Sequence, residues 1–183
     1  MLKIKIPEQE YWDETKEEFV YFKEVELCME HSLVSLAKWE SKWHKPFLKQ
    51  NNRMDDKTTE EIIDYFRCMT LTQNVDPSVY SRLTENNVKE ISAYIENPMT
   101  ATTFGEEKGK AGREIVTAEL IYYWMVALQI PMECQKWHLN RLLTLVRVCN
   151  IKNQPPKKMS TKQIAKRNSA LNAKRRAALH SKG

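Results

Sequence analysis

The chain has 183 residues, 42% of them hydrophobic, which is enough for one domain with a sizeable core and an extension. No charged start followed by an apolar block and a cleavage site is present, so we expect no secretion signal. Cys28, Cys68, Cys134 and Cys149 lie far apart and form no C-x-x-C pair. This spacing argues against a zinc site and a disulfide framework and fits a reducing cytosol.

The formal net charge of +5 is divided unevenly along the chain. Residues 1–150 hold 19 Lys and Arg against 24 Asp and Glu, a net charge of −5. Residues 151–183 hold 10 Lys and Arg and no acidic residue, a net charge of +10. We therefore predict an acidic helical globular domain over 1–150 and a basic tail, partly helical or disordered, over 151–183.

Two alternating segments near the N-terminus predict strands. Residues 2–6 alternate strictly between apolar and Lys side chains until Pro7, and residues 19–27 alternate well enough for a second strand. The acidic residues 8–18 between them are expected to be irregular. The two strands should form a small antiparallel ribbon that packs on helices or pairs with another subunit, because a lone hairpin is marginally stable.

The next two predicted elements are helices. The first covers about residues 29–44 and is stopped by Pro46. The second opens at Thr58 with Glu61 in a capping box. The expected buried side chains of the first are Leu33, Leu36, Ala37 and Trp43, with Trp39 at the flank, and those of the second are Ile62, Ile63, Tyr65, Phe66 and Met69.

Two shorter capped helices should follow. Asp76 caps a short helix that begins with Pro77, and Thr84 caps the next one, which ends before Pro98. The expected buried face of the latter is Val88, Ile91, Ala93, Tyr94 and Ile95. The glycine-rich residues 102–112 match neither the Walker nor the dinucleotide-binding pattern, so we predict a surface loop there, with partner binding as a minor alternative.

Residues 113–150 form the longest apolar stretch, which breaks at Pro131. We predict two core helices that meet at this proline, since it suits the first position of a new helix. The expected buried side chains are Ile115, Leu120, Ile121, Trp124, Met125 and Leu128 before it and Met132, Cys134, Trp137, Leu142, Leu145, Val146 and Cys149 after it. Charged residues interrupt both segments, so neither is expected to span a membrane.

The sequence offers little for catalysis. His31 lies between Glu30 and Ser32, but neighbouring helix residues point in different directions, so the three are not expected to form a triad. His138 lies on a core segment, where a hydrogen-bonded structural histidine is expected. We predict that the protein is not an enzyme and has no cofactor or metal site.

The tail should form a helix capped by Ser160 or Thr161 once a partner is bound, and should be disordered before. Ile164, Leu171 and Ala178 fall one heptad apart among its basic residues. The predicted partner-binding residues are Lys157, Lys158, Lys162, Lys166, Arg167, Lys174, Arg175 and Arg176. The tail lacks the aromatic residues that stack on bases, so docking on an acidic protein surface is favoured over nucleic acid, with a solubilising end as the third alternative.

Four stretches of the chain resemble a protein family of long-tailed bacteriophages: CMEHSLVSLAKWESKWHKPFL at 28–48, YIENPMTATTF at 94–104, REIVTAELIYYWMVALQIPMECQKWHLNRLLTLVRVCN at 113–150 and RNSALNAKRRAALHSKG at 167–183. The resemblance covers most of the chain after residue 20. Members of this family are usually described as tail assembly chaperones, and the resemblance implies no catalytic motif.

The resemblance implies a chaperone that coats the long, apolar, helical tape-measure protein until tail-tube subunits replace it. The implied partners are therefore the tape-measure and tail-tube proteins, in the cytoplasm of the infected bacterial host. Self-association into a homo-oligomer is left open, and no membrane partner is expected. The alternatives are a structural virion subunit, such as a tail or head-tail adaptor protein, and a nucleic-acid-binding protein that acts through the tail.

Overall fold

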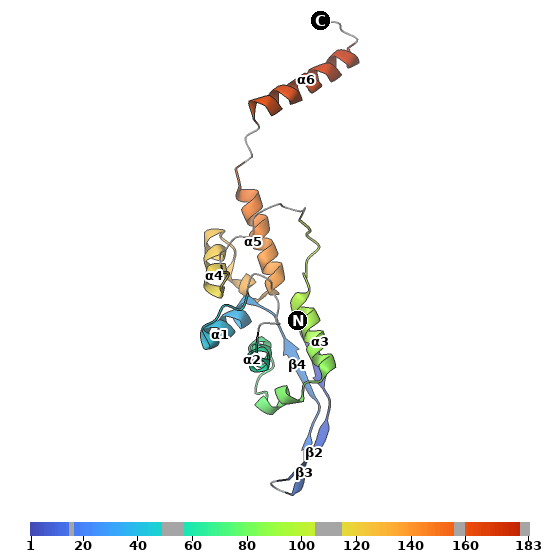
Figure 1. Ribbon diagram of the computed structural model, residues 1–183, viewed down its shortest axis with the longest axis vertical. Coiled ribbons are helices and arrows are strands. Elements are labelled where there is room, and N and C mark those ends of the chain that lie inside the picture. Colours follow the sequence, from blue (N-terminus) through green and yellow to red (C-terminus); the bar gives the residue numbers. More distant parts are fainter. Residues whose placement is uncertain (15–16, 49–56, 105–114, 156–159, 180–183) are drawn as a thin grey trace. The chain divides into compact units, whose positions relative to one another are not determined.

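The computed structural model describes residues 1–14, 17–48, 57–104, 115–155 and 160–179 (Figure 1). The chain divides into two compact units, Met1–Asn150 and Ile151–Gly183. Helices make up most of the described chain, and the strands all lie before residue 30. The predicted fold class, mainly helical with a short N-terminal antiparallel ribbon, is confirmed at this level.

The N-terminal ribbon is longer than the sequence pattern indicated. It consists of the four strands β1 (Leu2–Ile6), β2 (Gln9–Asp13), β3 (Glu18–Phe22) and β4 (Val25–Met29). β1 pairs with β4 and β2 pairs with β3, both antiparallel. Paired residue numbers add up to 31 throughout, from Leu2 with Met29 to Asp13 with Glu18. The two sheets are therefore successive halves of one hairpin.

Two sequence predictions about this ribbon are wrong. Residues 8–18 are not irregular, because β2 occupies most of their first half, and the single strand predicted over 19–27 is interrupted between β3 and β4. Cross-strand aromatic contacts explain the extra strand: the rings of Tyr11 and Phe22 stack with centroids 5.6 Å apart, although acidic residues surround them. Pro7 lacks an amide proton for pairing, and it stands where β1 and β2 are separated.

One face of the β1–β4 pair belongs to the hydrophobic core. Its inward side chains are Ile4, Ile6, Leu27 and Met29, all fully buried. The segment that follows the second helix lies along the free edge of β4, since Glu30 N donates to Met69 O at 2.9 Å and Leu71 N donates to Cys28 O at 2.7 Å. This pairing leaves β4 with a neighbour on both edges, which fixes the ribbon to the helices.

Helices α1 (Leu33–Trp43) and α2 (Thr59–Met69) pack against each other. The capping box of Thr58 and Glu61 at the start of α2 is confirmed. On α1 Leu33 and Leu36 are buried as predicted, but the rest of the predicted face is wrong. Trp39 is fully buried and donates from Nε1 to Glu61 O at 2.9 Å, whereas Trp43 and Ala37 are only half-buried. α1 also starts later than predicted, because Met29 ends β4 and Ser32 caps the helix.

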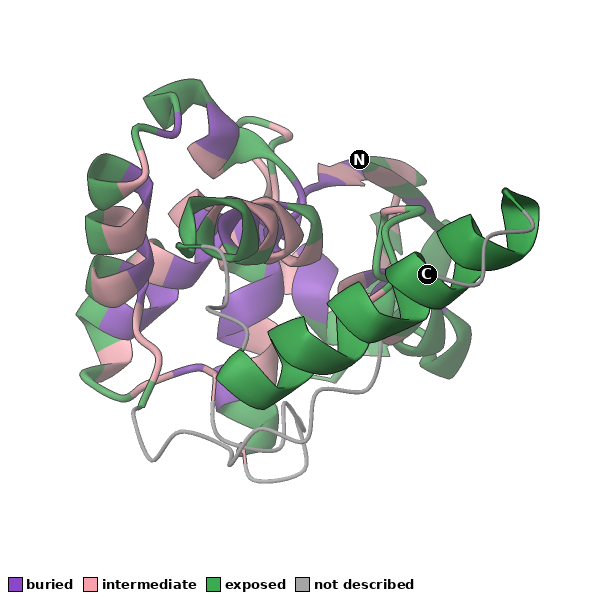
Figure 2. Cartoon of the chain, turned by 90° about the horizontal axis from the view of Figure 1, so that it is seen from above, coloured by how far each residue is buried: buried purple, intermediate pink, exposed green. Residues whose placement is uncertain are grey.

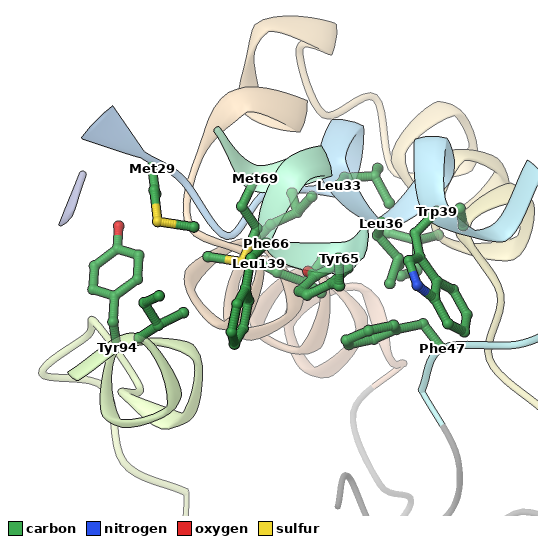
Figure 3. Packing of buried hydrophobic residues seen from close by; sticks show 14 of the residues in the cluster. Met29, Leu33, Leu36, Trp39, Phe47, Tyr65, Phe66, Met69, Tyr94 and Leu139 are labelled. Atoms are coloured by element: carbon green, nitrogen blue, oxygen red, sulfur yellow. The ribbon is translucent and has the colours of Figure 1, made fainter. Parts of the chain in front are cut away.

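The rings of Trp39, Phe47 and Tyr65 form the centre of the helical core (Figure 3). Phe47 stacks on Tyr65 with ring centroids 3.9 Å apart, and the edge of Trp39 meets Phe47 at 5.1 Å. On α2 the predicted residues Tyr65, Phe66 and Met69 are buried, while Ile62 and Ile63 are half-buried. Phe47 follows α1 by a few residues and was not among the predicted core residues.

The short 3₁₀ helix η2 (Pro77–Arg82) and helix α3 (Glu85–Glu96) begin at the predicted caps, Asp76 and Thr84. α3 ends at Asn97, before Pro98, as predicted. Only a narrow stripe of α3 faces the core, and its buried residues are Asn87, Ile91 and Tyr94. The prediction that Val88 and Ala93 are buried is wrong, and Ile95 is half-buried.

The predicted helix pair around Pro131 consists of α4 (Ala118–Ala127), the 3₁₀ helix η3 (Met132–Lys136) and α5 (Leu139–Asn153). α5 therefore starts later than predicted, because His138 pairs with Ser32 in a β-bridge and Leu139 N donates to His31 O at 2.7 Å. Residues of the predicted core that are exposed instead are Ile115, Met132 and Trp137. Ile121, Met125, Cys134, Leu142 and Val146 are buried as predicted, while Leu120, Trp124, Leu128, Leu145 and Cys149 are half-buried.

Of the predicted glycine-rich loop over 102–112, residues 105–112 lie outside the described residues. Residues 102–104 belong to neither a helix nor a strand. Among the described residues, no helix is long and apolar enough to cross a bilayer.

Candidate functional site

Helix α6 (Thr161–Ala178) carries most of the residues predicted to bind a partner. Ser160 caps it in a capping box with Gln163, one of the two caps proposed from the sequence, and alanine-rich composition favours the helix. All of its residues are exposed (Figure 2). The helix expected for this segment covers Thr161–Ala178.

The cations of α6 are distributed around the helix. Lys162, Lys166, Arg167, Lys174, Arg175 and Arg176 lie on it, whereas Lys157 and Lys158 lie outside the described residues. α6 has no acidic residue, so it attracts anionic surfaces from most directions. Ile164 and Leu171, seven residues apart, share one side and give α6 a narrow exposed apolar stripe.

A second exposed surface lies on α4. Tyr123 and Val126 are 65% and 68% exposed, and side chains three residues apart on a helix share a face. The opposite side of α4 is fixed in the core by Ile121 and Met125, both fully buried. We refer to Tyr123 and Val126 as the α4 stripe.

His31 and His138 form a buried cluster that also contains two tyrosines. The two imidazole rings meet edge to face with centroids 5.1 Å apart. The hydroxyl of Tyr65 lies 2.6 Å from His31 Nδ1, and Tyr94 O lies 3.0 Å from His138 Nε2. The hydrogen bond predicted for His138 is therefore confirmed, although its Nδ1 has no hydrogen-bond partner among the described residues.

Burial keeps both histidines neutral. Desolvation lowers the pKa of His31 from 6.5 to about 3, and the neighbouring His138 lowers it further in the same direction. Desolvation also lowers the pKa of His138. Burial and the hydrogen bond from its hydroxyl to Glu30 Oε1, 2.7 Å long, raise the pKa of Tyr94.

Glu30, His31 and Ser32 bond to different groups. The prediction placed them on a helix, but they lie between the end of β4 and the start of α1. Glu30 accepts from Tyr94 and pairs with the N-terminal ammonium at 3.0 Å, His31 pairs with Tyr65, and Ser32 caps α1 through Ser35 N at 3.3 Å. No hydrogen bond joins these three side chains to one another. Their arrangement links β4, α1, α2 and α3, which is a structural role.

Glu40 is a buried residue that sequence reasoning missed. Its Oε1 accepts from Phe47 N and its Oε2 from Ala118 N, both at 2.7 Å. Ala118 N is one of the free amides at the start of α4, so one carboxylate joins α1, the loop after it and α4. Burial raises the pKa of Glu40, against the effect of these two hydrogen bonds. A single Glu on a helix gives no sequence signal for such contacts.

The described residues contain no group of three His, Cys, Asp or Glu side chains placed to hold a metal ion. A cavity of about 160 Å³ opens beside His31 and is also lined by Phe47, Leu48, Ile95 and Asn140. This volume is below the roughly 300 Å³ at which small-molecule sites usually begin. The exposed α6 and the α4 stripe are therefore stronger candidates for function than the buried cluster.

Comparisons with protein families, curated proteins and solved structures found no match to the chain. The assignment of function below therefore rests on the chain's own surfaces and on the sequence resemblance.

Proposed function

We propose that the protein is a tail assembly chaperone of a long-tailed bacteriophage. It binds the tape-measure protein in the host cytoplasm, keeps it soluble and releases it as the tail tube assembles. The observation that supports this most strongly is α6, a helix with six cations, no acidic residue and no buried side chain. A helix whose side chains are all exposed in its own chain can use its whole surface to bind a partner.

The α4 stripe is the proposed site for the client. A tape-measure protein, as the resemblance implies, is a long apolar helix, and shielding it requires apolar surface on the chaperone. Tyr123 and Val126 supply such surface on a helix whose other side is held in the core. Burial of this stripe against the client gains about 25 cal/mol for each Å² of apolar surface removed from water.

α6 acts as a docking arm in this proposal. Its cations engage an acidic protein surface, and contacts between exposed charges weaken with salt because screening acts within about 8–10 Å at physiological ionic strength. The client site and the docking arm are on separate units of the chain, Met1–Asn150 and Ile151–Gly183. Each can therefore be changed without altering the other.

The test is co-expression of the chain with the tape-measure protein from the same phage, followed by pull-down of the soluble fraction. The wild-type chain should keep the tape-measure protein soluble and co-purify with it. A Tyr123→Ser/Val126→Ser variant should capture at least about tenfold less, since loss of about 1.4 kcal/mol corresponds to that factor.

Val88→Ser provides the matched control, because Val88 is an exposed apolar residue on α3. It should leave capture unchanged, and both variants should keep the wild-type melting temperature. An insoluble tape-measure protein beside abundant wild-type chain, or equal capture by the α4 variant, contradicts the proposal.

A further inference from the structure

The β2–β3 half of the hairpin extends beyond the helices of residues 1–150 (Figure 1). Exposed aromatic side chains lie on one of its faces. Trp12 and Phe19 are cross-strand partners whose rings meet edge to face with centroids 4.9 Å apart. Tyr21 lies two residues after Phe19 and therefore on the same face. The three side chains are 49%, 66% and 57% exposed, respectively. We call them the hairpin face.

The opposite face of the same hairpin contacts the body of the protein at Phe22. There Tyr11 stacks on Phe22, and the guanidinium of Arg82, from η2, lies 4.5 Å from the centre of the Phe22 ring. This cation–π contact orients the hairpin. The aromatic side chains of the hairpin face are thus presented to solvent on an anchored element.

The hairpin that carries this face is strongly acidic. The sequence over residues 8–24 contains Glu8, Glu10, Asp13, Glu14, Glu17, Glu18 and Glu24 against Lys16 and Lys23, a net charge of −5. Glu10 is the cross-strand partner of Tyr21, and the Tyr21 hydroxyl donates to Glu8 Oε2. A ligand that suits this surface is both cationic and apolar.

We propose that the hairpin face binds α6 of a second copy of the chain, so that copies associate head to tail. α6 has the required chemistry: Ile164 and Leu171 form its apolar stripe, and Lys174 and Arg175 flank Leu171 on its two sides at about 100° per residue. The stripe can cover Trp12 and Phe19 while the cations meet the carboxylates and the aromatic rings.

The dimensions of the two surfaces agree. Seven residues of helix separate Ile164 from Leu171, a rise of about 10.5 Å. Each five-residue strand of the hairpin is about 17 Å long, so both apolar residues fit along it. The acidic surface and the basic helix are different parts of the chain, so the contact is heterologous and leads to rings or open chains of subunits.

This inference names the acidic surface that α6 engages, and it rests on the role of docking arm given to α6 in the proposed function. It does not depend on the α4 stripe, because that stripe is on a different element. Self-association can therefore be measured with the protein alone, without the client.

The experiment is sedimentation velocity of the full chain at increasing concentration, at low and at high salt. The wild-type protein should form larger species as its concentration rises, and high salt should weaken this association. Two variants, Trp12→Ser/Phe19→Ser in the hairpin face and Lys174→Glu/Arg175→Glu in α6, should each remain monomeric, with the apparent Kd raised at least tenfold. The α6 variant should melt at the wild-type temperature, since its changed side chains are exposed. The hairpin variant also loses the Trp12–Phe19 ring contact, so it should melt slightly lower while remaining folded.

A mixture of the two variants gives the decisive result. The hairpin variant keeps an intact α6 and the α6 variant keeps an intact hairpin face, so the mixture should form dimers and nothing larger. The Tyr123→Ser/Val126→Ser variant should associate like the wild type. Failure of the wild-type chain to capture the tape-measure protein, with its self-association intact, overturns the proposed function alone.

Three outcomes overturn this inference. One is a wild-type chain that stays monomeric at all concentrations. A chain whose α6 binds its own hairpin would give the same result. Another is unchanged association of the hairpin variant. The third is a mixture of the two variants that remains monomeric.

Discussion

His31 and His138 face each other in the interior, edge to face, with ring centroids 5.1 Å apart. The backbone brings them together, because Ser32 and His138 form a β-bridge and Leu139 N donates to His31 O. Both histidines are buried. A proton on either ring therefore places a positive charge in the protein interior, next to the second imidazole ring.

We expect stability to fall as the pH drops below 6.5. The pKa of His31 is lowered to about 3 in the folded chain. Between pH 6.5 and 3, His31 therefore binds a proton in the unfolded chain but not in the folded chain. The contribution of neutral His31 to the free energy of unfolding is complete above pH 6.5 and is lost as the pH falls towards 3. From pH 7 to pH 5, His31 alone should cost about 2 kcal/mol of unfolding free energy, measurable by urea denaturation.

A His31→Gln variant serves as the control for this pH effect. It should be less stable at pH 7, because the contact with the Tyr65 hydroxyl is altered, but its stability should change less between pH 7 and pH 5. Equal pH slopes for the variant and the wild type would show that His31 is not the group that titrates.

Glu40 should be essential for the connection between α1 and α4. Glu40→Ala leaves the amides of Phe47 and Ala118 without their acceptor, at a cost of about 1–3 kcal/mol for each buried group. Glu40→Gln keeps one amide oxygen as acceptor and should lose less than Glu40→Ala. Urea unfolding of both variants gives the two values, and an equal loss would mean that a single amide oxygen cannot replace the carboxylate.

The two tryptophans Trp39 and Trp137 should differ in their importance for stability. Trp39 is 1% exposed and Trp137 is 36% exposed. Trp39→Ala should cost about 3–5 kcal/mol, as for a buried aromatic residue. Trp137→Ala should cost about 1 kcal/mol or less, because Trp137 is exposed and its ring stacks with the guanidinium of Arg141. Thermal and urea unfolding measure both losses of unfolding free energy. Similar losses for the two variants would contradict the assignment of Trp39 to the core and Trp137 to the surface.

Local chemistry explains why several features were predictable from the sequence. Thr58, Asp76 and Thr84 were identified as caps because their side chains bond to amides two or three residues away. The tail was identified by its charge alone. The helical assignment of residues 161–178 follows from their composition and the cap at Ser160.

Contacts between distant segments explain what was missed. Trp39 and Trp43 are four residues apart and equally apolar, and only the carbonyl of Glu61 and the ring of Phe47 decide that Trp39 is the buried one. The start of α5 was misplaced because Ser32 pairs with His138. Neither contact leaves a periodic pattern in the sequence.

The hairpin face was missed for a related reason. An exposed strand of acidic and aromatic residues has no buried side to produce a clear alternation, so residues 9–13 resembled a loop. Their assignment depends on pairing with β3. The α4 stripe was likewise hidden, since α4 is apolar on both its buried and its exposed sides.

Removal of residues 154–183 should leave the body intact. This cut keeps α5 whole, which ends at Asn153, and α6 has no buried residue. The melting temperature should therefore stay within about 2 °C of the full chain, a change of at most about 1 kcal/mol. A large decrease in thermal unfolding temperature would show that the tail belongs to the core.

The measurement that most directly tests a chaperone role is quantitative mass spectrometry of purified phage particles and of tail-assembly intermediates. A chaperone that leaves when the tube assembles should accompany the tape-measure protein in the intermediates and be depleted from mature particles. A copy number in mature particles equal to that of the structural subunits would contradict the chaperone role and identify a virion component.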